Sequence, residues 1–506
     1  MAKRVECLIL GLTLASVPML GACMEDPVVE PELDAAQAEL QSNGPTLVDE
    51  NLRVRSVVDG LMTPVTMVFL GANDMLVLEK NTGQVKRVVD GAVQGIVLDL
   101  AVNFGSERGL LGSALHPDFP TNPGVYLYWT ESTTGGDTNV LANTPLLGNR
   151  VDRFVWNGST LTLERNLIQL RALQPPFAAE PTPAAGRGNH DGGVLKFGPD
   201  GKLYIFIGDV GRRGHLQNLR CGPTNVYDCP PGTPVADDNF GGPTPDNAHL
   251  TGVVLRLNDD GSTPADNPFF AAGAAIGGEV GANIQKVFSY GHRNSFGMAF
   301  DPRSGGLWLQ ENGDDAFSEI NLVEPGMNGG WVQIMGPLSR NAQYREIETS
   351  SRFFGLQQSR WPPPNIGPAE ARSRLFMLPG AHYSDPEFSW KFEVSPGGIG
   401  FIDGAALGPQ YDGRLIVGGA RDLLREGHLF QLKLTGNRRK IGVDGGHLED
   451  RVADNVDKWE ITESENLLFG EGFGVVTDVH TGPNGNLFLV SLTHGAIYEV
   501  FQRTDK

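Results

Sequence analysis

A histidine flanked by an asparagine and an aspartate stands in a glycine-rich turn, GRGNHDGG, at residues 186–193. Neutral imidazole accepts a proton near pH 7, so His190 is a candidate general base. A neighbouring carboxylate can orient the ring and stabilise its charged form, which makes Asp191 the candidate catalytic partner. A histidine in such a turn also has an ordinary interpretation, as a hydrogen-bonded turn residue.

A second polar stretch, FSYGHRNSFGMAF, begins at residue 288 and follows the same kind of apolar run. Arg293 presents a planar guanidinium, which binds a planar anion through two parallel hydrogen bonds. His292 stands beside it in a similar setting. The alternative for Arg293 is a structural ion pair with one of the many carboxylates of the chain.

Residues 311–319, ENGDDAFSE, place four carboxylates around a glycine turn: Glu311, Asp314, Asp315 and Glu319. Hard oxygen donors at close spacing, together with backbone carbonyls, suit Ca²⁺. The spacing differs from that of an EF-hand loop, and a solvated acidic loop is the alternative interpretation.

Several other function classes are disfavoured. The sequence has no G-x-G-x-x-G between a strand and a helix, which argues against a nicotinamide-binding Rossmann domain. It also has no His or Cys cluster with zinc spacing and no G-x-S-x-G elbow. With 40 Lys and Arg against 60 Asp and Glu, the formal charge of -20 repels phosphate backbones, so we expect no nucleic-acid partner.

The elements that must position these residues come from a pattern that occurs six times, beginning at residues 70, 116, 198, 301, 411 and 482. Each copy has a turn rich in Gly, Asp, Asn or Pro, then a short apolar strand, then a polar turn and often a second strand. Alternation such as Leu203, Ile205 and Ile207 buries one face of a strand, which predicts four-stranded antiparallel units.

Such units bury their faces against neighbours when they are arranged radially. We therefore predict an all-β fold, a six-bladed β-propeller with long inter-strand loops. The longest insertions, 212–250 and 338–385, are rich in Pro, Gly, Asn and Arg and are predicted to be loops. Because loops on one face of a propeller converge on its axis, we expect the polar stretches to share one pocket. A β-sandwich or two smaller β domains is the alternative.

The N-terminus has the layout of a secretory signal, with two basic residues ahead of an apolar run. Residues 20–23, LGAC, resemble the bacterial lipobox, in which the cysteine, here Cys23, is lipidated. We expect a lipoprotein-type signal peptide at 1–23, a flexible tether at 24–51 and the propeller at 52–503. The mature protein is then exported and anchored by its lipid to the bacterial envelope, on the periplasmic or surface side of the outer membrane. An ordinary signal peptide is the alternative.

Two cysteines remain in the mature chain, Cys221 and Cys229, in the turn-rich segment RCGPTNVYDCPPG. In an oxidising compartment this pattern predicts a small disulfide loop.

Five runs resemble the soluble quinoprotein glucose dehydrogenase and sorbosone dehydrogenase family in their order and spacing: ERGLLGSALHPDF, NHDGGVLKFGPDGKLYIFIGD, VFSYGHRNSFGMAFDP, SEINLVEPGMNGGW and TDVHTGPNGNLFLV. The resemblance implies a six-bladed propeller that uses pyrroloquinoline quinone (PQQ) and Ca²⁺. It also implies oxidation of a hydroxyl of an aldose or related polyol, with electrons passed to an external acceptor.

The resemblance assigns roles to particular residues. His190 matches the base that takes the proton of the sugar hydroxyl while hydride passes to C5 of the quinone. Arg293 and Asn294, in GHRN, match the pair that contacts the reactive carbonyls of the quinone. Glu107 falls where the family has a polar residue near the sugar and the cofactor.

Three further positions follow from the same resemblance. The backbone at Gly313 and Asp314 falls where family members coordinate the Ca²⁺ of the cofactor, which polarises the quinone. Arg425, in LLREG, replaces a lysine that binds a cofactor carboxylate and can itself pair with one.

The chain departs from the family pattern at other places. Asn189 precedes the base where the family often has an acid, and Val475 and Thr477, in GFGVVTDV, stand where the family usually has two arginines for PQQ carboxylates. Two alternatives to a working dehydrogenase therefore remain. One is a non-catalytic propeller that binds a carbohydrate or a protein and has lost PQQ, and the other is a calcium-dependent lactonase-type hydrolase.

Overall fold

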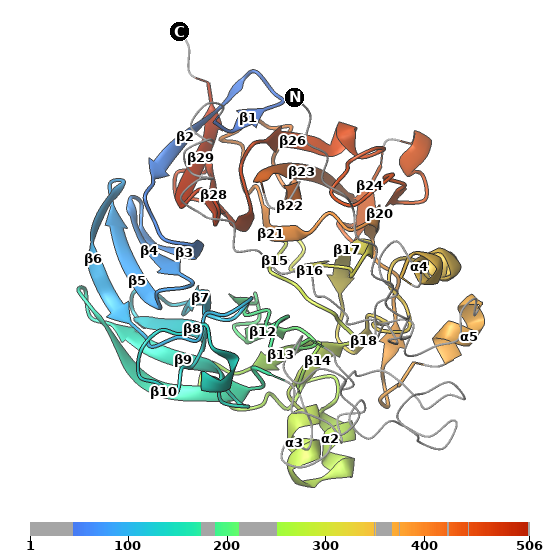
Figure 1. Cartoon of the computed structure of the whole chain (residues 1–506), viewed down its shortest axis with the longest axis horizontal. Coiled ribbons are helices and arrows are strands. Elements are labelled where there is room, and N and C mark those ends of the chain that lie inside the picture. Colours follow the sequence, from blue (N-terminus) through green and yellow to red (C-terminus); the bar gives the residue numbers. More distant parts are fainter. Residues whose placement is uncertain are drawn as a thin grey trace, which may run out of the picture.

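The computed structural model of the protein describes residues 44–173, 188–211, 250–348, 350, 367–373, 375–421, 425–443 and 445–503. The predicted signal peptide, Cys23 and the predicted disulfide between Cys221 and Cys229 lie outside these ranges. Most regular structure within them is β-strand, and the strands have a propeller arrangement, which confirms the all-β propeller prediction (Figure 1). None of the helices in the described ranges combines the length and hydropathy that crossing a bilayer requires.

The described strands form six sheets, each built on four antiparallel strands. We number the sheets along the chain. Sheet 1 holds β3 (Pro64–Gly71), β4 (Asp74–Glu79), β5 (Gln84–Val89) and β6 (Ala92–Asp99), and sheet 2 holds β7 (Leu110–Leu115), β8 (Gly124–Thr130), β9 (Asn149–Trp156) and β10 (Leu161–Leu170). Sheet 3 holds β11 (Leu195–Phe197), β12 (Leu203–Ile207), β13 (Val253–Leu257) and β14 (Val287–Tyr290), extended by β18 (Met327–Asn328) and β19 (His382–Tyr383).

The remaining sheets are built from the C-terminal half. Sheet 4 holds β15 (Met298–Phe300), β16 (Leu307–Glu311), β17 (Ala316–Val323) and β20 (Phe388–Phe392), extended by β25 (Val452–Ala453). Sheet 5 holds β21 (Pro396–Phe401), β22 (Leu415–Arg421), β23 (Arg425–Thr435) and β26 (Leu468–Glu471), with β1 (Thr46–Leu47) and β24 (Lys440–Gly442) at its edges. Sheet 6 holds β27 (Val476–Thr481), β28 (Leu487–Ser491), β29 (Ala496–Gln502) and β2 (Leu52–Val58).

The first long strand and the last strand pair with each other, which closes the ring. In sheet 6, β2 pairs antiparallel with β29 from Leu52 opposite Gln502 onward. The shorter β1 pairs with β26 of sheet 5. The sequence-based boundary at residue 52 is therefore wrong by several residues, because Thr46 and Leu47 already satisfy their backbone hydrogen bonds within a sheet.

The first strand of each four-stranded unit lies innermost. These six strands, β3, β7, β11, β15, β21 and β27, contact one another in this order, and β27 contacts β3. The ring in Figure 1 is thus closed by contacts between inner strands as well as by strand pairing.

The hydrophobic core is divided among the gaps between neighbouring sheets. Strand β12 shows how, because Leu203, Ile205 and Ile207 pack toward sheet 2, while Tyr204 and Phe206 pack toward sheet 4. Both faces of this strand are buried. Leu203, Ile205 and Ile207 therefore share one buried face as predicted, and the other face, which was not predicted to be buried, is covered by the next sheet.

The six copies of the predicted pattern fall in six different sheets, each including the second strand of its unit. The prediction that 338–385 is a loop is wrong in part, since it contains α4 (Asn341–Glu348) and α5 (Pro368–Ser373). In α4, Tyr344 and Ile347 lie three residues apart on one face and pack against Phe317 and Trp331. The insertion between β13 and β14 contains two more helices, α2 (Phe270–Ile276) and α3 (Gly278–Ile284).

Candidate functional site

His190 lies in the turn before β11, with its ring fixed by a carboxylate. Its Nδ1 is 2.6 Å from Oδ1 of Asp209, and both side chains are 5% exposed. Asp209 follows the end of β12, and its Oδ2 accepts a hydrogen bond of 2.9 Å from Nε1 of Trp331. Because an ionised carboxylate only accepts, Nδ1 of the neutral ring donates and Nε2 remains as the proton acceptor.

The prediction that Asp191 orients the base is wrong. Its Oδ1 accepts from Nδ2 of Asn149 at 2.8 Å, and its backbone carbonyl accepts from the hydroxyl of Tyr128 at 3.0 Å. The side chains of His190 and Asp191 point to opposite sides of the turn. Asp191 therefore binds Asn149, while His190 binds Asp209. Burial raises the pKa of Asp191 to about 7, although the nearby charge of Arg108 opposes this rise.

Glu107 joins the base to the second polar stretch. Its Oε2 accepts from the backbone N of His190 at 2.7 Å and from Nδ2 of Asn294 at 2.9 Å. His190 has a φ of 58°, a conformation that costs a non-glycine residue about 1–3 kcal/mol and persists where neighbours hold it. Gly112 allows the close approach of the two segments, since a Cβ there would lie 1.9 Å from the carbonyl oxygen of Gly193.

Arg293 occupies the other side of the site. Its Nη2 is 2.7 Å from Oδ1 of Asp314, its Nη1 donates to the carbonyl of Asn312 at 3.1 Å, and its guanidinium carbon lies 5.5 Å from the centroid of the Trp331 ring. Burial alone would lower the pKa of Arg293, but the carboxylates of Asp314 and Asp209 outweigh it and raise the pKa. The buried guanidinium therefore remains charged.

Two of the four acids of ENGDDAFSE have structural roles. The Oε2 atom of Glu311 lies 3.0 Å from Nδ1 of His292, whose Nε2 lies 3.0 Å from the hydroxyl of Ser289. His292 is thus enclosed on both ring nitrogens and is not the base. Glu319 binds the backbone N of Gly336 and the side chain of Asn321.

The other two acids lie together with a glutamate from α4. Asp314, Asp315 and Glu348 each offer a carboxylate oxygen, and these atoms lie within 4.8 Å of one another. Burial and the charge of Asp314 raise the pKa of Asp315 to about 6, against the effect of Lys458. Burial likewise raises the pKa of Glu348 well above its usual value. Gly313, the other predicted metal position, is close-packed, since a Cβ there would lie 2.1 Å from the carbonyl oxygen of Ala316.

Three further positions concern the predicted cofactor: Arg425, Val475 and Thr477. Arg425 stands in β23 opposite Arg421, with its side chain outside the described atoms. Val475 donates its backbone N to Oγ1 of Thr493 at 3.0 Å, and Oγ1 of Thr477 lies 3.5 Å from the carbonyl of Val490. Neither Val475 nor Thr477 places a charge in the site.

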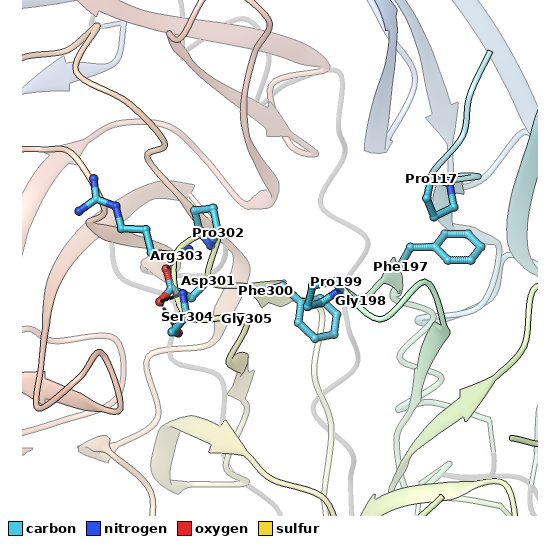
Figure 2. Close-up of a pocket in the computed structure, with 10 residues that line it drawn as sticks. All are labelled: Pro117, Phe197, Gly198, Pro199, Phe300, Asp301, Pro302, Arg303, Ser304 and Gly305. Atoms are coloured by element: carbon cyan, nitrogen blue, oxygen red, sulfur yellow. Dashed lines mark hydrogen bonds between the residues drawn. The ribbon is translucent and has the colours of Figure 1, made fainter. Parts of the chain in front are cut away.

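A cavity lies elsewhere in the described part of the chain. It has a volume of about 570 Å³ and is lined mainly by the turns before β12 and β16, with Phe197 beside Pro117 at one side and Phe300 beside Pro199 between the two turns (Figure 2). Asp209 follows the last residue of β12, whereas this cavity borders the turn before its first residue. The cavity and the polar site therefore lie at opposite ends of the same strand, and the chemistry described above assigns the function to the polar end.

Sequence reasoning missed three residues of the site: Asp209, Trp331 and Glu348. The sequence contained a signal for Asp209. The segment GDVG, which includes it, follows β12 directly and so lies at the same end of sheet 3 as the turn before β11. Glu348 had no comparable signal, since it comes from a helix within an insertion.

A closed ring of antiparallel sheets with a histidine, an arginine and a carboxylate cluster at one end defines an enzyme-like propeller. The chain belongs to the glucose/sorbosone dehydrogenase family, whose profile matches residues 61–361. It is therefore an oxidoreductase that acts on sugars.

Individual relatives agree with this assignment. Quinoprotein glucose dehydrogenase B of Acinetobacter calcoaceticus is 32% identical over 57% of this chain and 54% of that protein, so the matched part spans about half of its length. A structure from Thermus thermophilus, described as a putative oxidoreductase (glucose dehydrogenase), has a TM-score of 0.56 at 26% identity and covers 89% of this chain and 100% of that one. The PQQ-bound aldose sugar dehydrogenase of Streptomyces coelicolor has a TM-score of 0.53 at 22% identity, over 90% of this chain and 99% of that one, which shows a shared fold.

Proposed function

We propose that the protein oxidises a hydroxyl of an aldose or related polyol with PQQ as the hydride acceptor and His190 as the general base. The observation that carries this proposal is the His190–Asp209 pair, which leaves Nε2 of a buried imidazole as a proton acceptor. Glu107 links this histidine to Asn294, and Trp331 links Asp209 to Arg293. The quinoprotein relative at 32% identity supports the choice of cofactor.

The residues of the site fit a polar planar group. Nε of Arg293 and Oδ1 of Asn294 are buried atoms without a hydrogen-bond partner among the described residues. A buried polar atom without a partner costs about 1–3 kcal/mol, which a bound ligand with complementary atoms would recover. When bound, PQQ supplies a carbonyl carbon that accepts hydride.

Four residues of the protein have separate roles in the proposed reaction. His190 takes the proton of the sugar hydroxyl at Nε2, and Asp209 stabilises the imidazolium that forms. The buried charge of Arg293 favours negative charge that develops on the acceptor. Glu107 accepts hydrogen bonds from the backbone N of His190 and from the side-chain amide of Asn294, which fixes the position of one residue relative to the other.

Calcium is the second cofactor that we propose, with the backbone at Gly313 and Asp314 beside it. The carboxylates of Asp314 and Asp315 supply hard oxygen donors there, which supports this choice. Electrons leave through an external acceptor.

We also assign each of the six sheets to one blade, so that residues 52–503, together with the short β1, form a six-bladed propeller. The closed order of contacts among six inner strands supports this count. Residues 1–23 as a lipoprotein signal, Cys23 as the lipidated residue and a disulfide between Cys221 and Cys229 remain proposals, as does location at the bacterial envelope. Intact-mass analysis of the membrane fraction, with and without a reductant, tests these proposals together.

Binding and turnover test the proposed function together. The mature chain without residues 1–23 is titrated with PQQ in the presence of Ca²⁺, and dye reduction is followed with a panel of aldoses. Saturable binding with sugar-dependent dye reduction supports the dehydrogenase. Sugar binding without reduction would favour the non-catalytic propeller, and hydrolysis of a sugar lactone without PQQ would favour the lactonase.

A further inference from the structure

Three buried or partly buried carboxylates meet between the turn before β17 and the C-terminal end of α4. They belong to Asp314, Asp315 and Glu348, and Asp315 and Glu348 are 3% and 1% exposed. Glu348 is attached to the turn by one oxygen only, because its Oε1 accepts from the backbone N of Asp315 at 2.9 Å and of Ala316 at 3.0 Å. The helix and the turn are thus joined through the carboxyl group of Glu348.

The cations beside this cluster reach only some of its oxygens. Arg293 pairs with Oδ1 of Asp314, and Nζ of Lys458 lies 2.5 Å from Oδ1 of Asp315. The second oxygens, Oδ2 of Asp315 and Oε2 of Glu348, are buried and have no hydrogen-bond partner among the described residues. Two buried carboxyl oxygens of this kind are costly when they are left without a partner, and a bound ion is one explanation of such atoms.

We propose that Glu348 and Asp315, together with Asp314, bind a divalent cation through their carboxylate oxygens, and that the cation is Ca²⁺. All candidate ligands are hard oxygens, which favour Ca²⁺ or Mg²⁺ over softer metals. Ca²⁺ tolerates irregular ligand geometry at about 2.3–2.6 Å, whereas Mg²⁺ demands a near-ideal octahedron. Lys458 pairs with Oδ1 of Asp315, which leaves Oδ2 of Asp315 and Oε2 of Glu348 as candidate ligand atoms.

This inference deepens the proposed function, because it assigns calcium ligands to side chains of this chain. It adds α4, which lies in the insertion 338–385, to the metal site. A bound cation would tie α4 to the turn that carries Asp314, the partner of Arg293. The site would then set the position of the guanidinium as well as hold the ion.

Titration of the cofactor-free protein tests the proposal. The mature chain is treated with EGTA and titrated with CaCl₂ and, separately, MgCl₂ by calorimetry, and its Tm is recorded with EGTA and with Ca²⁺. We expect saturable Ca²⁺ binding that is tighter than Mg²⁺ binding and a rise in Tm of roughly 2 °C or more at saturating Ca²⁺. Since PQQ and sugar are both absent, this result is independent of whether the chain is a working dehydrogenase.

One variant and one control locate the ion. Glu348→Gln should weaken Ca²⁺ binding by about tenfold or more and remove most of the Ca²⁺-dependent rise in Tm. In EGTA the same variant should melt close to the wild-type temperature, because the amide oxygen of Gln can still accept from the backbone N of Asp315 and Ala316. A purely structural role for Glu348 would instead lower the Tm equally with EGTA and with Ca²⁺. Glu346→Gln changes an exposed glutamate of the same helix and should bind Ca²⁺ as the wild type does.

Two results would overturn the proposal. The first is a wild-type chain that shows no heat of binding and no change in Tm with either cation. The second is wild-type affinity in both Glu348→Gln and Asp315→Asn. Should Glu348→Gln fail to fold, Asp315→Asn and the wild-type titration still decide the matter.

Discussion

Asp209 and His190 are joined by a contact of 2.6 Å between Oδ1 and Nδ1, although 19 residues separate them in the sequence. Strand β11, the turn after it and strand β12 connect the two, so the chain leaves the site and returns to it within one hairpin. Trp331 completes the arrangement, since its indole N donates to Asp209 and its ring lies under Arg293. The proton acceptor and the buried cation are therefore fixed through a shared neighbour.

Replacing Asp209 should impair the base without removing it. In Asp209→Asn the amide can donate to Nδ1 and favour the opposite tautomer, so we expect kcat/KM for aldose oxidation to fall by about 10²-fold or more. The pH profile of kcat/KM should also change shape. Asp191→Asn is the matched control, and an equal loss in both variants would contradict the assignment of Asp209 as the positioning residue.

Asp191 should make stability depend on pH. Burial raises its pKa from 3.8 to about 7, so between these values the folded chain holds a proton that the unfolded chain has released. The free energy of unfolding therefore falls as the pH rises through this window, by roughly 4 kcal/mol at most at about 1.36 kcal/mol per pKa unit.

Asp191→Asn should remove this dependence. Urea unfolding across the window should show the variant gaining stability relative to the wild type as the pH rises. A difference between the two proteins that stays constant with pH would contradict the explanation.

The carboxylate of Asp478, on the inner strand β27, should support the fold rather than the reaction. Asp478 of β27 lies 2.8 Å from Nε2 of His480 and 3.6 Å from Nζ of Lys196, and it accepts from Thr66 of β3. Burial alone would raise its pKa, but His480 and Lys196 outweigh it and hold the pKa below its usual value.

Asp478→Asn should consequently destabilise the protein by about 1.5–3 kcal/mol at neutral pH, because it removes the buried carboxylate to which Thr66, His480 and Lys196 bind. The pKa of this acid is depressed, so the stabilisation exists above the unfolded value and is lost as the pH falls. Denaturant unfolding should show the gap between variant and wild type closing below about pH 4. A gap that widens in acid would be inconsistent with this sign.

Val475 and Thr477 should limit affinity for an anionic cofactor. Val475 directly precedes β27, Thr477 is its second residue, and neither carries a charge. Val475→Arg combined with Thr477→Arg should therefore tighten PQQ binding by about tenfold or more through charge-assisted hydrogen bonds. Fluorescence titration of the cofactor measures this directly. Unchanged affinity would show that these two positions do not face it.

The sequence predicted the arrangement of the sheets well because short-range alternation and turn residues carry it. All six copies of the pattern occupy separate sheets, and Glu107 contacts both His190 and Asn294, which brings three of the polar stretches together. The partner of the base could not be assigned from adjacency, since neighbouring side chains diverge and Asp209 approaches from the end of the next strand. Glu348 could not be found either, because nothing in its local sequence indicates where an inserted helix docks.

Reduction of bound PQQ by an aldose in a single turnover tests the central claim most directly. The wild type and His190→Ala are loaded with PQQ and Ca²⁺, mixed with excess sugar and followed by absorbance. We predict similar PQQ affinity in both proteins, with reduction slower by about 10²-fold or more in the variant. Equal reduction rates, or no PQQ binding by the wild type at about tens of micromolar cofactor, would contradict the account.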